Sequence, residues 1–245
     1  MSSLKTVQAS NAAYAPKYTP TAVFVGGTSG IGRAMAEAFA KQTNGNANII
    51  IVARNKAAAE EIIASFPTPS SSHIKHEFVL CDAQELKNVH ETSQLLLKKL
   101  DKLNLLVLSS GGLAFSRRDT VEGNDASMVL RSYSRVKFTR ELMPLLEKAA
   151  AAGEDARVSS ILAAGKGASP DLQDLNLTKW TYIKAMFGSG AYNDIAVKVK
   201  SLFLTHLIRS LTTQSRCSVS SIPTLLSFIY PPVRSTLPQC VPTGG

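Results

Sequence analysis

The sequence predicts an α/β fold built on a doubly wound parallel sheet. Short apolar runs alternate along the chain with amphipathic helical segments, which is typical of successive β-α-β units. The runs are apolar at consecutive positions, as in residues 49–52, and this suits strands that helices cover on both faces. We expect six strands, at residues 22–25, 47–53, 77–81, 105–108, 157–162 and 225–230.

The helices expected between these strands each carry an apolar stripe at helical spacing. The long segment that contains the third stripe is interrupted by Pro144. The stripes are Ile31, Met35, Ala38 and Phe39; Leu86, Val89, Leu96 and Leu100; Val129, Val136 and Met143; and Ile195, Val199, Leu202, Phe203, Leu207 and Leu211.

Length and composition indicate one domain. The chain has 245 residues with 44% hydrophobic content, which is ordinary for a globular α/β protein. Residues 1–20 are rich in Ala and Ser and lack the apolar core of a secretory signal, so we expect a loosely ordered leader followed by a single domain at 21–245. No run is long or apolar enough to span a membrane. We therefore expect a cytoplasmic protein with no membrane partner.

Charge and cysteine usage argue against several classes of function. The net charge of +9 is spread over many segments rather than gathered in one patch, so no nucleic-acid partner is expected. The three cysteines (Cys81, Cys217 and Cys240) and the four histidines have no metal-like spacing, so we expect no metal. Cys81 ends an apolar strand and is expected to be an inert buried thiol.

A glycine-rich turn follows the first strand and leads directly into a helix. Such a turn lets the backbone approach a ligand closely, and the N–H groups at the helix start attract phosphate. The sequence therefore predicts a pyrophosphate site at this turn. Its residues are Gly26, Gly27, Thr28, Ser29, Gly30, Ile31, Gly32 and Arg33.

The spacing Gly-x-x-x-Gly-x-Gly, formed by Gly26, Gly30 and Gly32, resembles the short-chain dehydrogenase/reductase family. The resemblance covers about residues 21–234 and implies a Rossmann-type fold, a nicotinamide cofactor and oxidoreductase activity. The segments LRSYSRVKFTRELMPLL and SILAAGKGASPDLQDLNL resemble a divergent branch of the family found in fungal specialised metabolism. The family also suggests a homo-oligomer.

The end of the second strand indicates the type of cofactor. Enzymes that prefer NAD usually place Asp or Glu there to bind the ribose hydroxyls, but this chain has Arg54 followed by Asn55. A guanidinium cannot accept a hydrogen bond, whereas it can clamp a 2′-phosphate. Arg33 lies just past the glycine turn and could add a second charge. We therefore expect NADP(H), although Arg54 could instead be a solvent-facing residue at the end of a strand.

Two further segments match the family's cofactor contacts. Asp82 stands where the family has an aspartate that bonds the adenine amino group. Residues 109–112 read Ser-Ser-Gly-Gly where the family usually has Asn-Asn-Ala-Gly, which implies that Ser109 and Gly111 approach the cofactor.

The match is weaker at the catalytic centre. The family uses Ser, Tyr and Lys, with Tyr and Lys four residues apart on one helix face, and an Asn from an earlier helix. Tyr192 begins the corresponding helix, but Ala196 stands where Lys is expected. The family's Asn position falls on Arg131, and Ser160 precedes its serine position. The predicted catalytic set is therefore Tyr192, Ser160 and Arg131, against the alternative that Tyr192 and Ser160 are structural.

The C-terminal part also departs from the family. The chain stops soon after the sixth expected strand, so the family's usual last strand is expected to be lacking. A shortened gene product and a natural compact variant both fit this observation.

Together these features predict an NADP(H)-dependent oxidoreductase. It would transfer a hydride to or from a carbonyl-type group of a small organic metabolite, in secondary-metabolite biosynthesis. Two alternatives remain open: a catalytically degenerate NADP(H)-binding protein that acts as a sensor or partner, and a truncated inactive enzyme.

Overall fold

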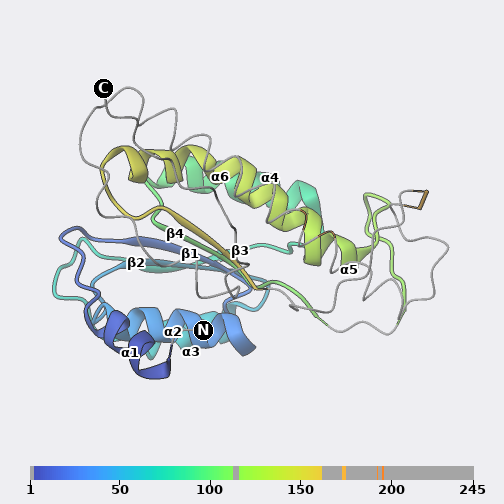
Figure 1. Cartoon of the computed structure of the whole chain (residues 1–245). Helices are drawn as coiled ribbons and strands as arrows, with labels where there is room; N and C mark the ends of the chain where they lie inside the picture. Colours follow the sequence, from blue (N-terminus) through green and yellow to red (C-terminus); the bar gives the residue numbers. More distant parts are fainter. Residues whose placement is uncertain (1–2, 113–115, 162–172, 175–191, 193–194, 196–245) are drawn as a thin grey trace, which may run out of the picture.

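The computed structural model describes residues 3–112, 116–161, 173–174, 192 and 195. Within these residues a parallel sheet is covered by helices on both faces, as Figure 1 shows. The elements in chain order are α1 (Leu4–Ala12), β1 (Thr21–Val25), α2 (Gly30–Gln42), β2 (Asn48–Ala53), α3 (Lys56–Ala64), β3 (His76–Leu80), α4 (Leu86–Lys99), β4 (Leu105–Leu108), α5 (Ala126–Met128), the π-helix η1 (Val129–Tyr133), α6 (Ser134–Ala151) and β5 (Arg157–Ser160).

The strand order β3-β2-β1-β4-β5 confirms the predicted doubly wound parallel sheet. The chain moves outward from β1 to β2 and β3, then returns to add β4 on the other side of β1. This reversal makes the carboxyl ends of β1 and β4 a topological switch point, which is where open α/β sheets bind ligands. The sixth expected strand, at 225–230, lies outside the described residues.

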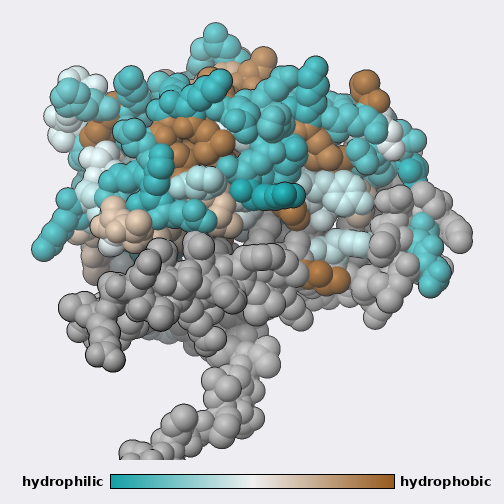
Figure 2. Space-filling model, turned by 90° about the horizontal axis from the view of Figure 1, so that it is seen from above, coloured by the Kyte–Doolittle hydropathy of each residue, from teal (hydrophilic) through white to brown (hydrophobic). Residues whose placement is uncertain are grey.

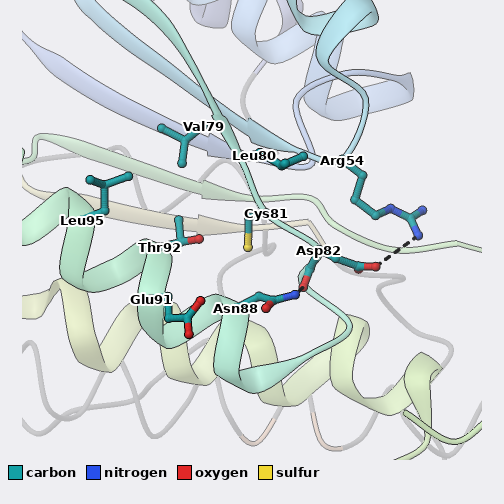
Figure 3. A pocket seen from close by; sticks show the side chains of 9 residues that line it. All are labelled: Arg54, Val79, Leu80, Cys81, Asp82, Asn88, Glu91, Thr92 and Leu95. Atoms are coloured by element: carbon teal, nitrogen blue, oxygen red, sulfur yellow. Dashed lines mark hydrogen bonds and ion pairs between the residues drawn. The ribbon is translucent and has the colours of Figure 1, made fainter. Parts of the chain in front are cut away.

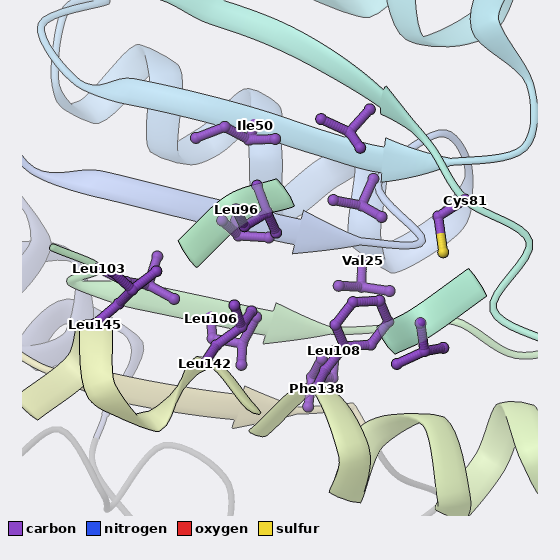
Figure 4. Packing of buried hydrophobic residues seen from close by; sticks show 14 of the residues in the cluster. Val25, Ile50, Cys81, Leu96, Leu103, Leu106, Leu108, Phe138, Leu142 and Leu145 are labelled. Atoms are coloured by element: carbon purple, nitrogen blue, oxygen red, sulfur yellow. The ribbon is translucent and has the colours of Figure 1, made fainter. Parts of the chain in front are cut away.

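The three central strands β1, β2 and β4 bury both of their faces, as their consecutive apolar residues predicted. The outer strands β3 and β5 are only partly buried, and Leu80 at the end of β3 is 68% exposed. Val23 and Val25 of β1 face a core shared with α4 and α6, while Ala22 and Phe24 face a second core shared with α2 and α3. Figure 4 shows the first core, in which Phe138 and Leu142 of α6 pack against the sheet. Alternation along a strand sends neighbouring side chains to opposite faces, so two helix layers need two apolar sets.

The stripe predicted for α2 is confirmed in part: Met35 and Phe39 are partly buried and pack against the core, but Ile31 and Ala38 do not belong to the buried face. The buried residues of this helix are Gly32, Ala36 and Ala40, whereas Ala38 is exposed and Ile31 is 61% exposed. Small residues face the sheet because the helix approaches it closely, and hydrophobicity alone does not reveal such a face.

The stripe predicted through Val129, Val136 and Met143 is also wrong in part, because Val136 is 40% exposed. The π-helix η1 lies between Val129 and Val136, and its wider turn rotates the following residues away from an α-helical phase. The buried face of α6 carries Phe138, Leu142 and Leu145 instead. The helix continues through Pro144 to Ala151, so the expected interruption does not occur.

Within the expected leader, residues 4–12 form α1, which Ser3 caps by accepting a hydrogen bond from the Thr6 N–H. No residue of this helix is buried. No helix in the described residues is long and apolar enough to cross a membrane. Figure 2 shows the side formed by α4 and α6, where hydrophilic residues dominate and hydrophobic ones form small separate groups.

Candidate cofactor and active site

The glycine turn lies at the carboxyl end of β1, at the switch point of the sheet. Gly26 and Gly30 both adopt left-handed backbone conformations, with φ of 88° and 54°. A Cβ on Gly26 would lie 2.6 Å from the Ser110 nitrogen, whereas a Cβ on Gly30 would meet no atom of the described residues within 4 Å. Gly26 is therefore required for packing inside the protein, while Gly30 borders open space at the start of α2.

This open space suits a phosphate group. Helix α2 begins at Gly30, and the first N–H groups of a helix have no acceptor within it. The capping position is held by Ser29 in an extended conformation, and its side chain makes no capping hydrogen bond. Donors at the positive end of a helix dipole beside free space form an anion site, so the turn fits the predicted pyrophosphate.

Ser109 ties the exit of β4 to this turn. Its N–H donates to the Val25 carbonyl at 2.9 Å, and its hydroxyl donates to the Gly26 carbonyl at 3.1 Å. A Cβ on Gly32 would collide with the same Ser109 hydroxyl at 2.1 Å. The structure therefore gives Ser109 a packing role at the turn, where the sequence predicted a cofactor contact.

The next residue, Ser110, has a buried hydroxyl that forms no hydrogen bond with the described residues. A buried hydroxyl usually has a partner, because leaving it unpaired costs free energy. A ligand placed over the glycine turn could supply one. Gly111, the other predicted contact here, is exposed.

Arg54 and Asp82 meet at the ends of β2 and β3, as Figure 3 shows. Their Nη1 and Oδ2 atoms are 3.9 Å apart, and both side chains are partly exposed. They line one end of a cavity of about 500 Å³ that runs between β3 and α4. Asp82 also accepts a hydrogen bond from the Gln84 N–H, which fixes its carboxylate at the edge of the sheet. The structure thus brings together the two residues predicted for the adenosine end.

The other two residues predicted near the 2′-phosphate have partners within the protein. Arg33 donates to Glu37 at 2.7 Å and to Glu61 at 3.4 Å, which offsets its charge and raises its pKa. Asn55 caps α3 by accepting a hydrogen bond from the Ala58 N–H. Arg54 is therefore the stronger of the two predicted phosphate ligands.

Cys81 is buried between β3 and α4, as predicted. Burial raises the pKa of its thiol, although a hydrogen bond with Thr92 opposes the shift. A thiol of raised pKa is a poor nucleophile at neutral pH, which agrees with an inert role. Within the described residues, no group of His, Cys, Asp and Glu side chains could hold a metal ion.

Ser160 is contacted by Arg135, which the predicted catalytic set does not contain, and the catalytic role of Arg131 stays a prediction. Arg135 is only 6% exposed, and its Nη1 donates to the Ser160 hydroxyl at 2.8 Å. Arg131 donates instead to the Gly112 carbonyl at 3.1 Å. The sequence analysis missed Arg135 because arginine is rarely buried. Its spacing from Phe138 and Leu142 on the buried face of α6 was a signal that could have placed it there.

Tyr192, the third predicted catalytic residue, is helical and partly buried. The neighbouring positions 191, 193 and 194 lie outside the described residues, and so does Ala196. Tyr192 therefore stays a prediction.

Comparison with known proteins identifies the family. The family model for short chain dehydrogenases matches residues 20–170. The chain belongs to the short-chain dehydrogenase family. It is 35% identical over 212 residues to Oxidoreductase AN1596 of Emericella nidulans, covering 86% of this chain and 60% of that protein. It is 36% identical over 160 residues to Oxidoreductase andH of Emericella variicolor, covering 64% of this chain and 45% of that protein.

Among solved structures, the fold resembles that of the NADPH-bound carbonyl reductase from chicken fatty liver. The TM-score is 0.59 at 16% identity, covering 77% of this chain and 75% of the other. This likeness supports the Rossmann-type fold alone. The chain spans 60% and 45% of the lengths of the two fungal relatives.

Proposed function

We propose that this protein is an NADP(H)-dependent oxidoreductase that acts on a carbonyl-type group of a small organic metabolite. The observation that carries the proposal is the pairing of two features along one sheet edge: the open cradle at Gly30 and the cation of Arg54 at the end of β2. The first suits a pyrophosphate and the second a 2′-phosphate. Similarity to fungal oxidoreductases supports the reaction class. A role in secondary metabolism is part of the proposal.

Each part of the site has a separate task in this proposal. The start of α2 holds the pyrophosphate, Arg54 the 2′-phosphate, and Asp82 the adenine amino group. When bound, the reduced nicotinamide supplies a hydride to the carbonyl carbon. The carbonyl π electrons then move to oxygen, which takes up a proton. Ser160 holds that oxygen and Tyr192 supplies the proton. We further propose a cytoplasmic enzyme that forms homo-oligomers.

Exchange of charge at Arg54 tests the proposal. Arg54→Asp should weaken NADPH binding by roughly 10-fold to 100-fold, the worth of a charge-assisted hydrogen bond, and should bring NADH affinity closer to that of NADPH. Lys56→Asp is the matched control, because Lys56 is exposed, lies two residues away and pairs with Glu60. Equal effects of the two substitutions on NADPH binding, measured by calorimetry, would contradict a specific role for Arg54.

A test for hydride transfer distinguishes an active enzyme from the alternative, a catalytically degenerate NADP(H)-binding protein. Purified protein is mixed with NADPH deuterated at nicotinamide C4 and a panel of ketones, quinones and imines, and the product is examined for deuterium by mass spectrometry. Deuterium in the reduced product supports the proposal. Tight NADPH binding with no transfer to any probe supports a non-catalytic binding protein instead.

A further inference from the structure

Arg135 lies where the sheet opens beyond the carboxyl ends of β4 and β5. The ladder between these strands ends at Leu108 and Ser160, followed by one more bond from the Ile161 N–H to the Leu108 carbonyl. Past this point the guanidinium of Arg135 links the two segments. It donates to the Ser110 carbonyl after β4 at 2.7 Å, and to the Ile161 carbonyl after β5 at 2.6 Å.

The π-helix η1 is part of this arrangement. Arg135 is the second residue of α6, which follows η1, and its Nε donates back to the Leu130 carbonyl within η1 at 3.2 Å. The guanidinium therefore joins three segments: the exit of β4, the exit of β5 and the turn before α6. Single π-turns inside helices are frequent at functional sites.

The cation is buried at a cost to the protein. Burial and the nearby charge of Arg131 lower the pKa of Arg135 to about 10, so the group stays charged at neutral pH. The four acceptors described above, including the Ser160 hydroxyl, are neutral. A buried arginine is uncommon in proteins, and such exceptions are expected at functional sites.

Its effect on Ser160 is directional. A hydroxyl has one proton to donate and two lone pairs that accept. Because a guanidinium only donates, Ser160 accepts from Arg135 and keeps its own proton for another acceptor. The bond from a charged donor also polarises the hydroxyl, which strengthens the hydrogen bond that it can donate.

We propose that Arg135 is a positioning residue that orients the Ser160 hydroxyl to donate a hydrogen bond to the oxygen of the substrate. This proposal rests on the proposed oxidoreductase function. It adds to the site a cation on α6, Arg135, which was not among the residues predicted from the sequence. In reduction the hydrogen bond strengthens as the oxygen gains negative charge, so its loss should lower kcat more than it raises KM.

The test compares Arg135→Lys and Arg135→Met with Arg140→Met, a control at an exposed arginine on the same helix. With 9,10-phenanthrenequinone as the probe, we expect kcat to fall on the order of 10²-fold in Arg135→Met, the usual worth of one such donor. Lysine keeps the charge but cannot form the planar fork, so Arg135→Lys should recover only part of the loss. Added methylguanidine should partly restore turnover in Arg135→Met, which would not happen if the substitution merely loosened the fold.

Two readouts keep this inference separate from the function on which it rests. Fluorescence titration should give an NADPH affinity in Arg135→Lys and Arg135→Met within about threefold of wild type, since the hydrogen bonds described for Arg135 lie at η1 and the exits of β4 and β5, and the phosphates are proposed to bind at the start of α2 and at Arg54. Ser160→Ala should lower kcat as Arg135→Met does, and the double variant should lose little more, because both changes break one unit.

Wild-type turnover in Arg135→Met, or additive losses in the double variant, would overturn the inference while leaving the proposed function standing. A wild-type protein that binds no NADPH contradicts the proposed function itself. If Arg135→Met fails to fold, Ser160→Ala and Arg135→Lys decide: unchanged kcat in both overturns the inference.

Discussion

Replacing Gly30 with alanine separates the binding role of the glycine turn from its packing role. Gly26→Ala is the matched comparison, because both glycines have left-handed φ angles and both variants pay the same kind of backbone cost, about 1–2 kcal/mol. They differ in what the new Cβ meets. At Gly30 it meets no atom of the described residues within 4 Å, whereas at Gly26 it lies 2.6 Å from the Ser110 nitrogen.

The expected magnitudes follow from this difference. Gly30→Ala should unfold about 2–8 °C below wild type, since about 1 kcal/mol shifts the melting temperature of a protein of this size by about 2–4 °C. Gly26→Ala should lose about 1–3 kcal/mol more, because backbone atoms must move to accept the methyl group. NADPH affinity should nevertheless fall at least about 10-fold in Gly30→Ala, as its Cβ occupies the space proposed for the pyrophosphate.

Thermal unfolding and calorimetric titration with NADPH measure both effects on the same samples. A folded Gly30→Ala variant that binds NADPH with wild-type affinity would refute the placement of the pyrophosphate at α2. Equal melting temperatures for the two variants would refute the packing argument at Gly26.

Three further predictions concern stability and chemistry. Asn104→Ala should lower the free energy of unfolding, measured in urea, by about 2–4 kcal/mol. Asn104 is 3% exposed, and its side chain accepts a hydrogen bond from the Thr21 N–H and donates to Glu154 and to the Asp155 carbonyl. A loss below about 1 kcal/mol would contradict this expectation. Burial raises the pKa of Glu141, but hydrogen bonds from Lys137 and His90 together lower it by more, so the pKa of Glu141 lies below the ordinary 4.5. The stabilisation that Glu141 gives the fold should be complete above pH 4.5 and should be lost as the pH falls through the lowered pKa. Glu141→Gln should therefore make the free energy of unfolding depend less steeply on pH in this acidic range, and an unchanged dependence would contradict the expectation. Tyr192→Phe should lower NADPH-dependent reduction by roughly 10²–10⁴-fold, and a wild-type rate would make Tyr192 structural.

The strands were predictable because their physics is local. A strand buried on both faces needs consecutive apolar residues, and the expected ranges at 22–25, 47–53, 77–81 and 105–108 each lie within one residue of β1 to β4 at either end. The glycine turn was predictable for a similar reason, since the left-handed backbone at Gly26 and Gly30 requires glycine. Neither prediction needs knowledge of distant contacts.

The errors arose where tertiary packing overrides the local pattern. The fully buried residues of α2 are Gly32, Ala36 and Ala40, whose small side chains let the helix lie close to the sheet and do not stand out in a search for large apolar residues. The π-helix η1 changes which residues of the next helix face the core, and we could not predict this π-helix from the sequence pattern. The buried guanidinium of Arg135 donates hydrogen bonds to the Ser110 and Ile161 carbonyls, which follow two different strands. These partners lie about 25 residues away in the sequence, so the local pattern around Arg135 does not reveal them. Asn55 and Ser109 form hydrogen bonds within the protein that the sequence did not reveal, and their contact with the cofactor stays a prediction.

The most direct test of the central claim is a calorimetric titration of the unaltered protein with NADPH and, separately, with NADH. We expect saturable binding of one NADPH per chain, at least about 10-fold tighter than NADH, because Arg54 adds a charge-assisted bond to the 2′-phosphate. A folded protein that binds neither dinucleotide, or that binds both equally well, would contradict it.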